Sequence, residues 1–309
     1  MSSVEILLAT FNSETFIEEQ VDSIFSQTDQ DWHLTIQDGG SRDRTVSIVK
    51  KIASKYEKKI TFIQHDNGHL SAKKNFGSLL SKAHSPLYMF CDQDDVWFKN
   101  KVELTKDFYY SLHSKNEKQP VLIFTDSVVT DNKLIPLSNS FLAFQNLNPR
   151  KLALNNLLLQ NVAPGNTMLF NNSLKELALP IPSQAIMHDH WLILICSIFG
   201  RIHFLDSPTL FYRQHGNNVV GATKFSFLSI LKKTLNNSFN MEGSLTKDFE
   251  QAEAIYKLYE QDLPQESKEI LKLFINVRKQ TFFQRRISLL EGGFLKHGFI
   301  RNLGLFFLI

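Results

Sequence analysis

Short apolar runs alternate with helical patterns through the first 91 residues, and this alternation constrains the fold more than any other feature. The expected strands and helices fall, in chain order, at 4–9, 13–25, 32–37, 46–56, 60–64, 72–83 and 87–91. Strand–helix–strand units of this length connect by right-handed crossovers. We therefore expect an α/β fold with a mostly parallel sheet flanked by helices, and ligands at the carboxyl ends of the strands.

The pattern changes in the rest of the chain. Between residues 125 and 160 we expect loops around a helix near 152–159, on one side of the ligand cleft, and a strand follows at 168–170. After Gly221 the strand signals end. Helices are then expected at 225–235, 245–259 and 265–280, so we place a boundary near residue 222.

Composition bounds the location of the protein. Both cysteines, Cys91 and Cys196, lie in apolar stretches, which favours reduced core residues and a cytoplasmic location. The N-terminus has no signal-peptide pattern, and the apolar run at 303–309 is far shorter than the roughly 20 residues that span a bilayer. The net charge of +3 is too small to indicate nucleic-acid binding.

A basic and aromatic segment ends the chain. From Arg278 onward, six basic residues and one acid, Glu291, lie among six phenylalanines, and residues 224–233 have a similar composition. Such segments are typical of membrane surfaces, where each basic residue near an anionic leaflet adds about 1 kcal/mol of binding. Packing in the core is the ordinary alternative.

Three carboxylates, Asp92, Asp94 and Asp95, directly follow the expected strand at 87–91. Like charges this close repel one another and raise their pKa values unless a cation is present. A divalent ion such as Mg²⁺ or Mn²⁺ is the usual solution, and it could also hold a diphosphate leaving group. A solvated acidic turn is the alternative, but the position between a buried strand and Trp97 favours metal binding.

Polar residues also follow the first two strands. Thr10 and Asn12 come after the first, and Asp38 comes after the second with two glycines behind it. The glycines permit tight turns and close ligand approach, and Asp38 can accept a hydrogen bond from the imide N–H of uracil or thymine. These residues predict a pocket for a nucleotide base. Ser41 and Asp43 are expected to cap the following helix.

These motifs resemble glycosyltransferase family 2, which has the nucleotide-binding GT-A fold. The family's first block is similar to residues 9–12, its Asp-Asp-Gly-Ser-x-Asp turn to 38–43, and its Asp-x-Asp motif to 92–94. Gly39 stands where the family usually has a second aspartate. Further matches at 66–68, 74–76, 92–97 and 212–218 are similar to the rhamnosyltransferase-like branch.

The resemblance implies roles for individual residues. Donor contacts would come from Thr10, Asn12, Asp38, Lys74, Asp92, Arg213 and Gln214, and the cation would be held by Asp92, Asp94 and His215. Asp92 would meet both ribose and metal, and Asp94 would be the main metal ligand. Residues 213–215 would close over the diphosphate.

Asp189, at the start of an apolar helical stretch, matches the family's catalytic base. An inverting transfer needs one carboxylate opposite the leaving group to take the acceptor's proton, a contribution of roughly 10²–10⁴-fold. Helix capping is the alternative role for Asp189. His188 stands where glutamate is commoner and is expected to tune that carboxylate. Gly165 and Asn166 are similar to the family's acceptor loop, and with His188 and Trp191 they complete the expected acceptor site.

The resemblance implies an inverting, metal-dependent glycosyltransferase of cell-wall or other surface polysaccharide synthesis. Residues 1–222 would form the GT-A domain, with a nucleotide-binding half at 1–98 and an acceptor-binding half at 99–222. Residues 223–309 would form a helical C-terminal region that associates with membrane.

We expect transfer of L-rhamnose from dTDP-rhamnose to a lipid-linked saccharide at the inner face of the cell membrane. A UDP-hexose or UDP-N-acetylhexosamine donor is an alternative, and a noncatalytic scaffold that binds sugar nucleotides is another. A phosphoacceptor receiver domain is too short to account for the residues after Asp95. The oligomeric state stays open, with a homodimer among the options.

Overall fold

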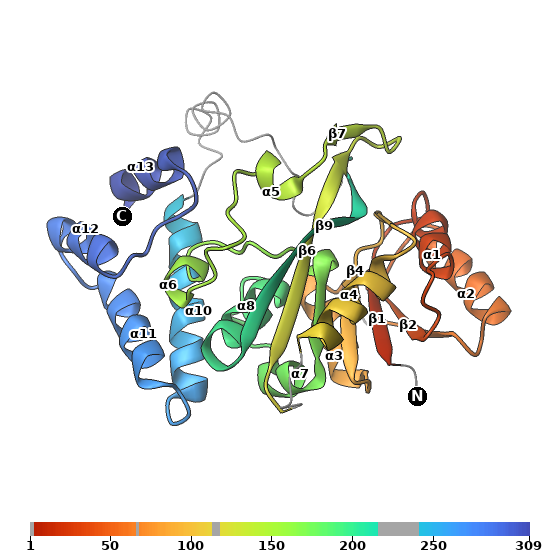
Figure 1. Ribbon diagram of the computed structural model, residues 1–309, viewed down its shortest axis with the longest axis horizontal. Coiled ribbons are helices and arrows are strands. Elements are labelled where there is room, and N and C mark those ends of the chain that lie inside the picture. The colour runs from red at the N-terminus through yellow and green to blue at the C-terminus, as the bar shows by residue number, and fades with distance from the viewer. Residues whose placement is uncertain (1–2, 66–67, 113–117, 216–240) are drawn as a thin grey trace.

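The computed structural model describes residues 3–65, 68–112, 118–215 and 241–309. One sheet crosses the molecule, helices cover both of its faces, and further helices follow at the C-terminal end of the chain (Figure 1). The α/β architecture with C-terminal helices expected from the sequence is confirmed.

The N-terminal half of the sheet is parallel, as predicted. Its strands are β1 (Val4–Thr10), β2 (Trp32–Asp38), β3 (Ile60–Gln64) and β4 (Leu87–Cys91), in the spatial order β3-β2-β1-β4, and the crossover helices are α1 (Ile17–Phe25), α2 (Thr45–Lys55) and α3 (Ala72–Lys82). The register pairs Thr10 with Asp38 and Leu8 with Cys91. Residues that follow these strands therefore meet at one edge of the sheet.

The C-terminal half makes the sheet mixed. Its strands are β5 (Val96–Trp97), β6 (Val121–Thr130), β7 (Pro136–Ser138), β8 (Met168–Asn171) and β9 (Arg201–Arg213). β8 lies antiparallel between β4 and β6, β9 runs parallel to β6, and β5 and β7 pair antiparallel with β9 and β6. The mostly parallel arrangement thus holds only as far as β4.

The loops predicted from residue 125 are wrong for residues 125–130, because β6 continues to Thr130 with all ten of its residues buried. Its polar side chains tolerate burial because they have partners. The hydroxyl oxygens of Thr125 and Thr209 lie 2.7 Å apart. Asp126 accepts hydrogen bonds from the backbone N–H groups of Phe141 and Leu142 at 3.0 and 3.2 Å.

Helices in the second half of the chain cover the sheet and extend beyond it. They are α4 (Lys101–Ser111), α5 (Phe141–Phe144), α6 (Leu154–Leu157), a 3₁₀ turn at Gly165–Thr167, α7 (Asn172–Ala178), α8 (His188–Phe199), α10 (Met241–Tyr259), α11 (Gln265–Val277), α12 (Phe282–Glu291) and α13 (Phe299–Leu308). The helices expected near 245–259 and 265–280 are α10 and α11. The helix expected at 225–235 and the boundary near 222 lie outside the described residues.

The C-terminal helices share a hydrophobic core with the sheet. Phe249 and Ile255 of α10 belong to the same buried cluster as Trp191 of α8. Two polar contacts add to this packing: the backbone N–H of Ile186 donates to the side chain of Gln251 at 2.8 Å, and the Tyr259 hydroxyl donates to a carbonyl of α7 at 2.7 Å. Of the helices that the structure describes, none has the length and apolar character needed to cross a membrane.

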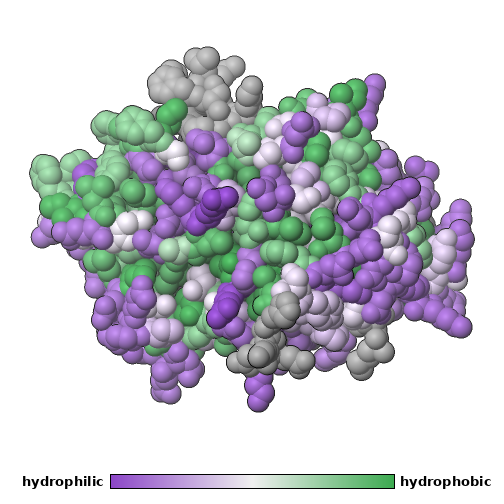
Figure 2. Space-filling view, in the orientation of Figure 1, coloured by the Kyte–Doolittle hydropathy of each residue, from purple (hydrophilic) through white to green (hydrophobic). Residues whose placement is uncertain are grey.

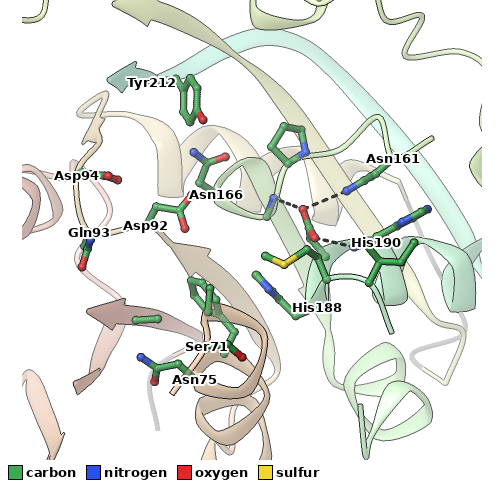
Figure 3. Close-up of a pocket in the computed structure, with 18 of the residues that line it drawn as sticks. Ser71, Asn75, Asp92, Gln93, Asp94, Asn161, Asn166, His188, His190 and Tyr212 are labelled. Carbon is green, nitrogen blue, oxygen red and sulfur yellow. Dashed lines mark hydrogen bonds between the residues drawn. The ribbon is translucent and has the colours of Figure 1, made fainter. Parts of the chain in front are cut away.

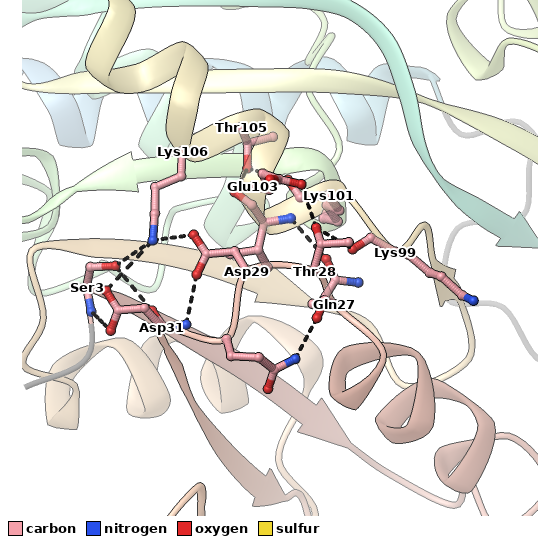
Figure 4. Close-up of polar contacts among 12 residues, drawn as sticks. Ser3, Gln27, Thr28, Asp29, Asp31, Lys99, Lys101, Glu103, Thr105 and Lys106 are labelled. Carbon is pink, nitrogen blue, oxygen red and sulfur yellow. Dashed lines mark hydrogen bonds and ion pairs between the residues drawn. The ribbon is translucent and has the colours of Figure 1, made fainter.

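A polar cluster fixes the sheet at the amino end of β1, away from the ligand edge (Figure 4). Lys106 of α4 forms ion pairs with Asp29 and Asp31, and the backbone N–H of Ser3 donates to Asp31 at 3.1 Å. This cluster ties α4 to the loop before β2. We therefore interpret it as structural.

Candidate active site

A cavity of about 760 Å³ opens where β1 and β4 end, at the predicted edge of the sheet. Residues with predicted roles that line it are Thr10, Asp92, Asp94, Gly165, Asn166, His188 and Asp189. Figure 3 shows Asp92 and Asp94 on one side of the cavity, and Asn161 and His190 on the other. The cavity therefore brings together the acidic turn, the 165–166 loop and the start of α8.

Asp38 lies at the end of β2, beside this cavity but outside its lining, and only 1% of it is exposed. One carboxylate oxygen accepts from the Thr10 hydroxyl at 3.1 Å and from the Ser41 hydroxyl. The other accepts from the backbone N–H groups of Gly40 and Ser41 at 2.9 and 2.8 Å. Four donors fill the acceptor capacity of a carboxylate, so Asp38 organises this turn. Base recognition by Asp38 stays a prediction that requires one donor to be released.

Three neighbouring residues stabilise these loops: Asp43 caps α2, and Ser41 and Asn12 link the loop after β1 to the turn after β2. Asp43 accepts from the backbone N–H of Thr45 at 2.9 Å, at the first residue of α2, as predicted. The capping role predicted for Ser41 is wrong, because its hydroxyl instead accepts from the backbone N–H of Asn12 at 2.8 Å. Asn12 is exposed, accepts from the backbone N–H of Arg42 at 2.8 Å, and lies outside the cavity lining.

Tight packing accounts for glycine at position 39. A Cβ atom there would lie 3.0 Å from the side chain of Asn75, and 3.2 and 3.3 Å from the carbonyl oxygens of Thr10 and Leu70. Contacts this short require the neighbours to move. The aspartate that the resemblance predicts at this position would therefore not fit the present arrangement.

Gln93 fixes the acidic turn to the first loop. Its side-chain amide accepts from the backbone N–H of Phe11 at 2.7 Å and donates to the carbonyl of the same residue at 3.2 Å. The middle residue of Asp92-Gln93-Asp94 thus sets the direction of the two carboxylates around it.

Asp94 and His215 bring two potential ligand atoms together: carboxylate Oδ2 and imidazole Nε2 are 2.7 Å apart. In an octahedral Mg²⁺ site with bonds of about 2.1 Å, adjacent ligand atoms are roughly 3 Å apart, so a small widening would admit the ion. Within the described part of the chain, no three His, Cys, Asp or Glu side chains gather as a metal cluster. These residues fit a cation whose remaining ligands come from substrate phosphates and water.

Asp92 is in an unfavourable electrostatic position without a cation. Burial, followed by the charges of Asp94 and Asp189, raises the pKa of Asp92 to about 7. A bound cation would reverse the effect of the neighbouring charges and keep this carboxylate ionised.

The structure gives Arg213 a different role from the predicted diphosphate contact. Its guanidinium donates to the backbone carbonyls of Asp94 and Asn132, both at 2.9 Å, and forms an ion pair with Glu19. It also lies over the ring of Phe16, 4.9 Å from the centroid, and the side chain is only 4% exposed. The predicted diphosphate contact is therefore wrong: the Arg213 guanidinium donates to protein groups and supports the acidic turn through the Asp94 carbonyl.

Asp189 lies across the cavity from the acidic turn. One oxygen accepts from the side chain of Asn161 at 3.0 Å and the backbone N–H of Gly165 at 3.2 Å, and the other accepts from the backbone N–H of His190 at 2.8 Å. Burial raises the pKa of Asp189 to about 6, although these hydrogen bonds oppose the shift. A carboxylate with this pKa, held at fixed orientation beside a cavity, suits a general base near neutral pH.

Asp95 connects the two sides of the cavity. Its carboxylate accepts from the Asn166 side chain at 2.5 Å and from the backbone N–H of Arg213 at 3.3 Å. The fully buried Lys101 donates to the Asn166 carbonyl at 2.9 Å and to the Thr209 hydroxyl at 3.1 Å, and burial lowers its pKa to about 7. Gly165, the residue before Asn166, donates to Asp189, so two hydrogen bonds and the backbone between these neighbours connect the acidic turn to the base.

His188 and Trp191 occupy different places on α8. His188 lines the cavity and stacks on Phe76 with ring centroids 4.1 Å apart, and among the described residues no group hydrogen-bonds either of its ring nitrogens. Burial lowers its pKa to about 3, so the ring is neutral. Trp191 is fully buried in the core and donates to the Ala178 carbonyl at 2.8 Å. The predicted acceptor contact by Trp191 is therefore wrong.

Two other predicted donor contacts lie outside the cavity lining. Lys74 is exposed on α3, whereas its neighbour Asn75 lines the cavity. Gln214 donates its backbone N–H to the Thr130 carbonyl at 2.9 Å. Several lining residues had no predicted role: Phe11, Asn75, Gln93, Asn161 and Tyr212. Four of these lie within or beside quoted motifs, but nothing in the sequence marked Asn161.

Comparison with known proteins finds a family and a curated relative that each match more than half of the chain. A family described as "Glycosyl transferase family 2" matches residues 5–177. A curated relative named "dTDP-rhamnosyl transferase RfbG", from Shigella flexneri, is 27% identical over 226 residues, which cover 70% of this chain and 74% of the relative.

Two solved structures share the fold. The S. aureus TarS 1–349 complex with UDP-GlcNAc superposes with a TM-score of 0.57 at 16% identity, covering 89% of this chain and 72% of that one. The mannosyltransferase PcManGT from Pyrobaculum calidifontis, in complex with GDP-Man and Mn²⁺, gives a TM-score of 0.51 at 14% identity, covering 97% and 87%.

Proposed function

The chain belongs to glycosyltransferase family 2 and is a glycosyltransferase, and from this premise we propose that it inverts the anomeric centre of a nucleoside diphosphate sugar. Asp189 would be the general base, and the turn at Asp92 and Asp94 would bind the donor's diphosphate through Mg²⁺ or Mn²⁺. The observation that carries the proposal is the position of Asp189 opposite the acidic turn in one cavity.

The proposed reaction uses few groups. Asp189 takes the proton from an acceptor hydroxyl as the hydroxyl oxygen bonds to the anomeric carbon of the donor and the bond from that carbon to the diphosphate breaks. Asn161 and Gly165 hold the base in orientation, each through a hydrogen bond to the same carboxylate oxygen. When bound, the cation would stabilise charge on the departing diphosphate, while Asp94 and His215 would hold it in place.

For the donor we propose dTDP-rhamnose. Two observations support this donor. The chain is similar over most of its length to the relative named as a dTDP-rhamnosyl transferase, and residues 92–97 and 212–218 resemble the rhamnosyltransferase-like branch of the family. A UDP-hexose or UDP-N-acetylhexosamine is the second candidate. The structural likeness to the TarS complex with UDP-GlcNAc concerns the fold and does not favour that donor.

For the acceptor we propose a lipid-linked saccharide of cell-surface polysaccharide synthesis, used at the inner face of the membrane. In this arrangement Gly165, Asn166 and His188 would face the acceptor. The support for this assignment is that all three residues line the cavity and that Gly165 also donates to Asp189.

A donor panel tests the proposal. Purified enzyme is incubated with dTDP-rhamnose, UDP-glucose, UDP-galactose or UDP-N-acetylglucosamine in the presence of Mn²⁺ or Mg²⁺. With water as the acceptor of the sugar, the released nucleoside diphosphate is measured. We expect wild type to release dTDP from dTDP-rhamnose. Chelation of the metal should abolish this release, and the variants Asp94→Asn and Asp189→Asn should both lack it. Release from a UDP-sugar alone would replace the donor assignment, and full activity with chelator would refute the role of the cation.

A further inference from the structure

Exposed apolar side chains concentrate on α12 and α13. Among the described residues, eleven large hydrophobic side chains are clearly exposed, and seven of them lie between 282 and 307. Phe283, Phe299 and Phe307 are the most exposed, at 75, 80 and 74%. Figure 2 shows apolar side chains gathered over these two helices. We call the seven residues the aromatic face: Phe282, Phe283, Ile287, Leu290, Phe299, Leu303 and Phe307.

Each helix buries one side and leaves the aromatic face outward. On α12 the buried side chains are Ser288 and Leu289, whereas Phe283, Ile287 and Leu290 follow the spacing of one helical stripe. On α13, Phe299, Leu303 and Phe307 recur every four residues, while Leu305 is fully buried. Two neighbouring amphipathic helices with outward apolar stripes are unusual for a surface that meets only water.

The charge around this face identifies what covers it. Six basic residues and one acid lie between 278 and 309. Lys296 is largely buried near Asp248 and Arg301 bonds backbone carbonyls, so the positive charge at the surface comes from Arg278, Lys279 and the half-buried Arg285 and Arg286. The guanidinium of Arg286 lies 3.3 Å from the centre of the Phe282 ring. An anionic lipid surface complements both the charge and the apolar side chains. A second copy of the chain fits less well, because a symmetric dimer would set these exposed basic side chains against those of its copy.

The helix pair also contacts the wall of the cavity. The Arg301 guanidinium donates to the carbonyls of Gln145 and Asn146 at 2.7 and 3.3 Å. The backbone N–H of His297 donates to the Gln160 side chain at 2.9 Å, and the His297 ring accepts from the backbone N–H of Asn148 at 2.7 Å. Gln145 and Gln160 line the cavity. The residues that support the aromatic face therefore also support the acceptor side of the site.

We propose that the aromatic face binds an anionic lipid bilayer and that this binding places the acceptor side of the cavity next to the membrane surface. The helices lie in the plane of the interface, with their exposed phenylalanines in the headgroup region and the exposed Arg278 and Lys279 on lipid phosphates. Membrane binding itself does not depend on the proposed function. Only its biological role, access to a lipid-linked acceptor, rests on that function.

Vesicle sedimentation tests the binding without any need for activity. The probes are vesicles of phosphatidylcholine alone and of phosphatidylcholine with about one third phosphatidylglycerol. We expect wild type to bind the anionic vesicles, more weakly at high salt, and the triple variant Phe283→Gln/Phe299→Gln/Phe307→Gln to bind about tenfold more weakly or worse. The control Ile135→Gln/Leu137→Gln/Leu258→Gln removes three large apolar side chains that are exposed elsewhere, at 58, 56 and 57%, and should bind as wild type does.

Three results would overturn the proposal. Wild type that ignores anionic vesicles at low salt, or a triple variant that binds normally, would show that the face does not meet lipid. A dimer in solution that the same triple variant converts to a monomer would show that a second copy covers the face. Sugar-nucleotide turnover is measured separately, so failure here leaves the proposed reaction standing, and loss of turnover leaves this test intact.

Fluorescence quenching tests the orientation. Both native cysteines are buried, so a single introduced cysteine can be labelled. Lys151→Cys lies on the exposed loop near His297, and Lys51→Cys lies on α2, at the opposite end of the molecule from α12 (Figure 1). With quencher-bearing anionic vesicles, a label at 151 should be quenched several-fold more than one at 51. Equal quenching, or stronger quenching at 51, would contradict the orientation.

Discussion

The two sides of the cavity differ in which polar side chains the protein itself satisfies. On the donor side, Asp38 accepts four hydrogen bonds, Gln93 is paired with the Phe11 backbone, and Arg213 supports the acidic turn. The side-chain oxygen of Asn75 is the exception there, since it has no partner among the described residues. On the acceptor side, neither ring nitrogen of His188 nor the side-chain carbonyl of Asn166 has a hydrogen-bond partner among the described residues.

This difference separates two ways of building a site. The donor side is a preorganised frame, in which side chains fix turns and the carboxylates of Asp92 and Asp94 face outward from a rigid support. On the acceptor side, three buried polar atoms have no partner among the described residues, at a cost of roughly 1–3 kcal/mol each. We therefore assign donor binding to the side with Asp92 and Asp94, and proton transfer to the side with Asp189.

The largest expected effect comes from removing the base. Asp189→Asn should lower kcat by about 10²–10⁴-fold, because the acceptor hydroxyl loses the carboxylate that takes its proton. Donor affinity should stay unchanged, since the variant leaves the acidic turn intact. Steady-state kinetics with the preferred donor provides the measurement, and Asp206→Asn, an exposed aspartate on β9, is the control.

A smaller loss is expected when the connection between the two sides is cut. Asp95→Asn places an amide against two donors, the Asn166 side chain and the Arg213 backbone, and leaving a buried donor unpaired costs about 1–3 kcal/mol. We expect kcat/KM to fall about ten- to a hundredfold. Asp131→Asn, whose carboxylate accepts from two backbone N–H groups away from the cavity, should retain activity. Activity of Asp95→Asn equal to wild type would mean that the two sides act independently.

Activity should fall at acidic pH, because Asp189 becomes protonated. The base works only as a carboxylate, and burial raises the pKa of Asp189 to about 6, so activity is lost as pH falls through 6. Between pH 7 and pH 5, kcat should fall about tenfold. The profile is measured at saturating donor and metal, and a kcat that stays constant down to pH 5 would exclude Asp189 as the titrating base.

The rigid donor frame predicts the smallest effect. Gly39→Ala introduces a Cβ within 3.4 Å of Asn75, Thr10 and Leu70, and should destabilise the fold by about 1 kcal/mol, at the low end for overpacking. Gly77→Ala in α3 meets only Ile181 at an ordinary 3.7 Å and should be neutral or stabilising. Thermal unfolding compares the two, and a Gly39→Ala variant as stable as Gly77→Ala would show that the frame is looser than described.

The sequence predicts the donor side better than the acceptor side for a physical reason. Strands β1 to β4 are short apolar runs separated by amphipathic helices, so local periodicity identifies them and their parallel pairing aligns Thr10 with Asp38. β6 carries Thr125 and Asp126 inside a fully buried strand, which interrupts the apolar pattern. Their burial depends on partners far along the chain, such as Thr209, which no local pattern reveals.

The same limit applies to the site residues. The acidic turn and Asp189 were predicted to act in one place, and the structure brings both to the cavity. Arg213 and Trp191 were assigned contacts that the structure gives to the protein interior instead, because a motif records which residues are present but not which way they face. Asn161, which holds the base, belongs to no motif and is identified only by the hydrogen bond it makes.

Isothermal titration of donor in the presence of Mn²⁺ tests the division between the two sides most directly. Wild type and Asp189→Asn should bind dTDP-rhamnose with the same affinity, whereas Asp94→Asn should bind at least about tenfold more weakly because it loses a cation ligand. Weaker binding by Asp189→Asn together with unchanged binding by Asp94→Asn would contradict the account.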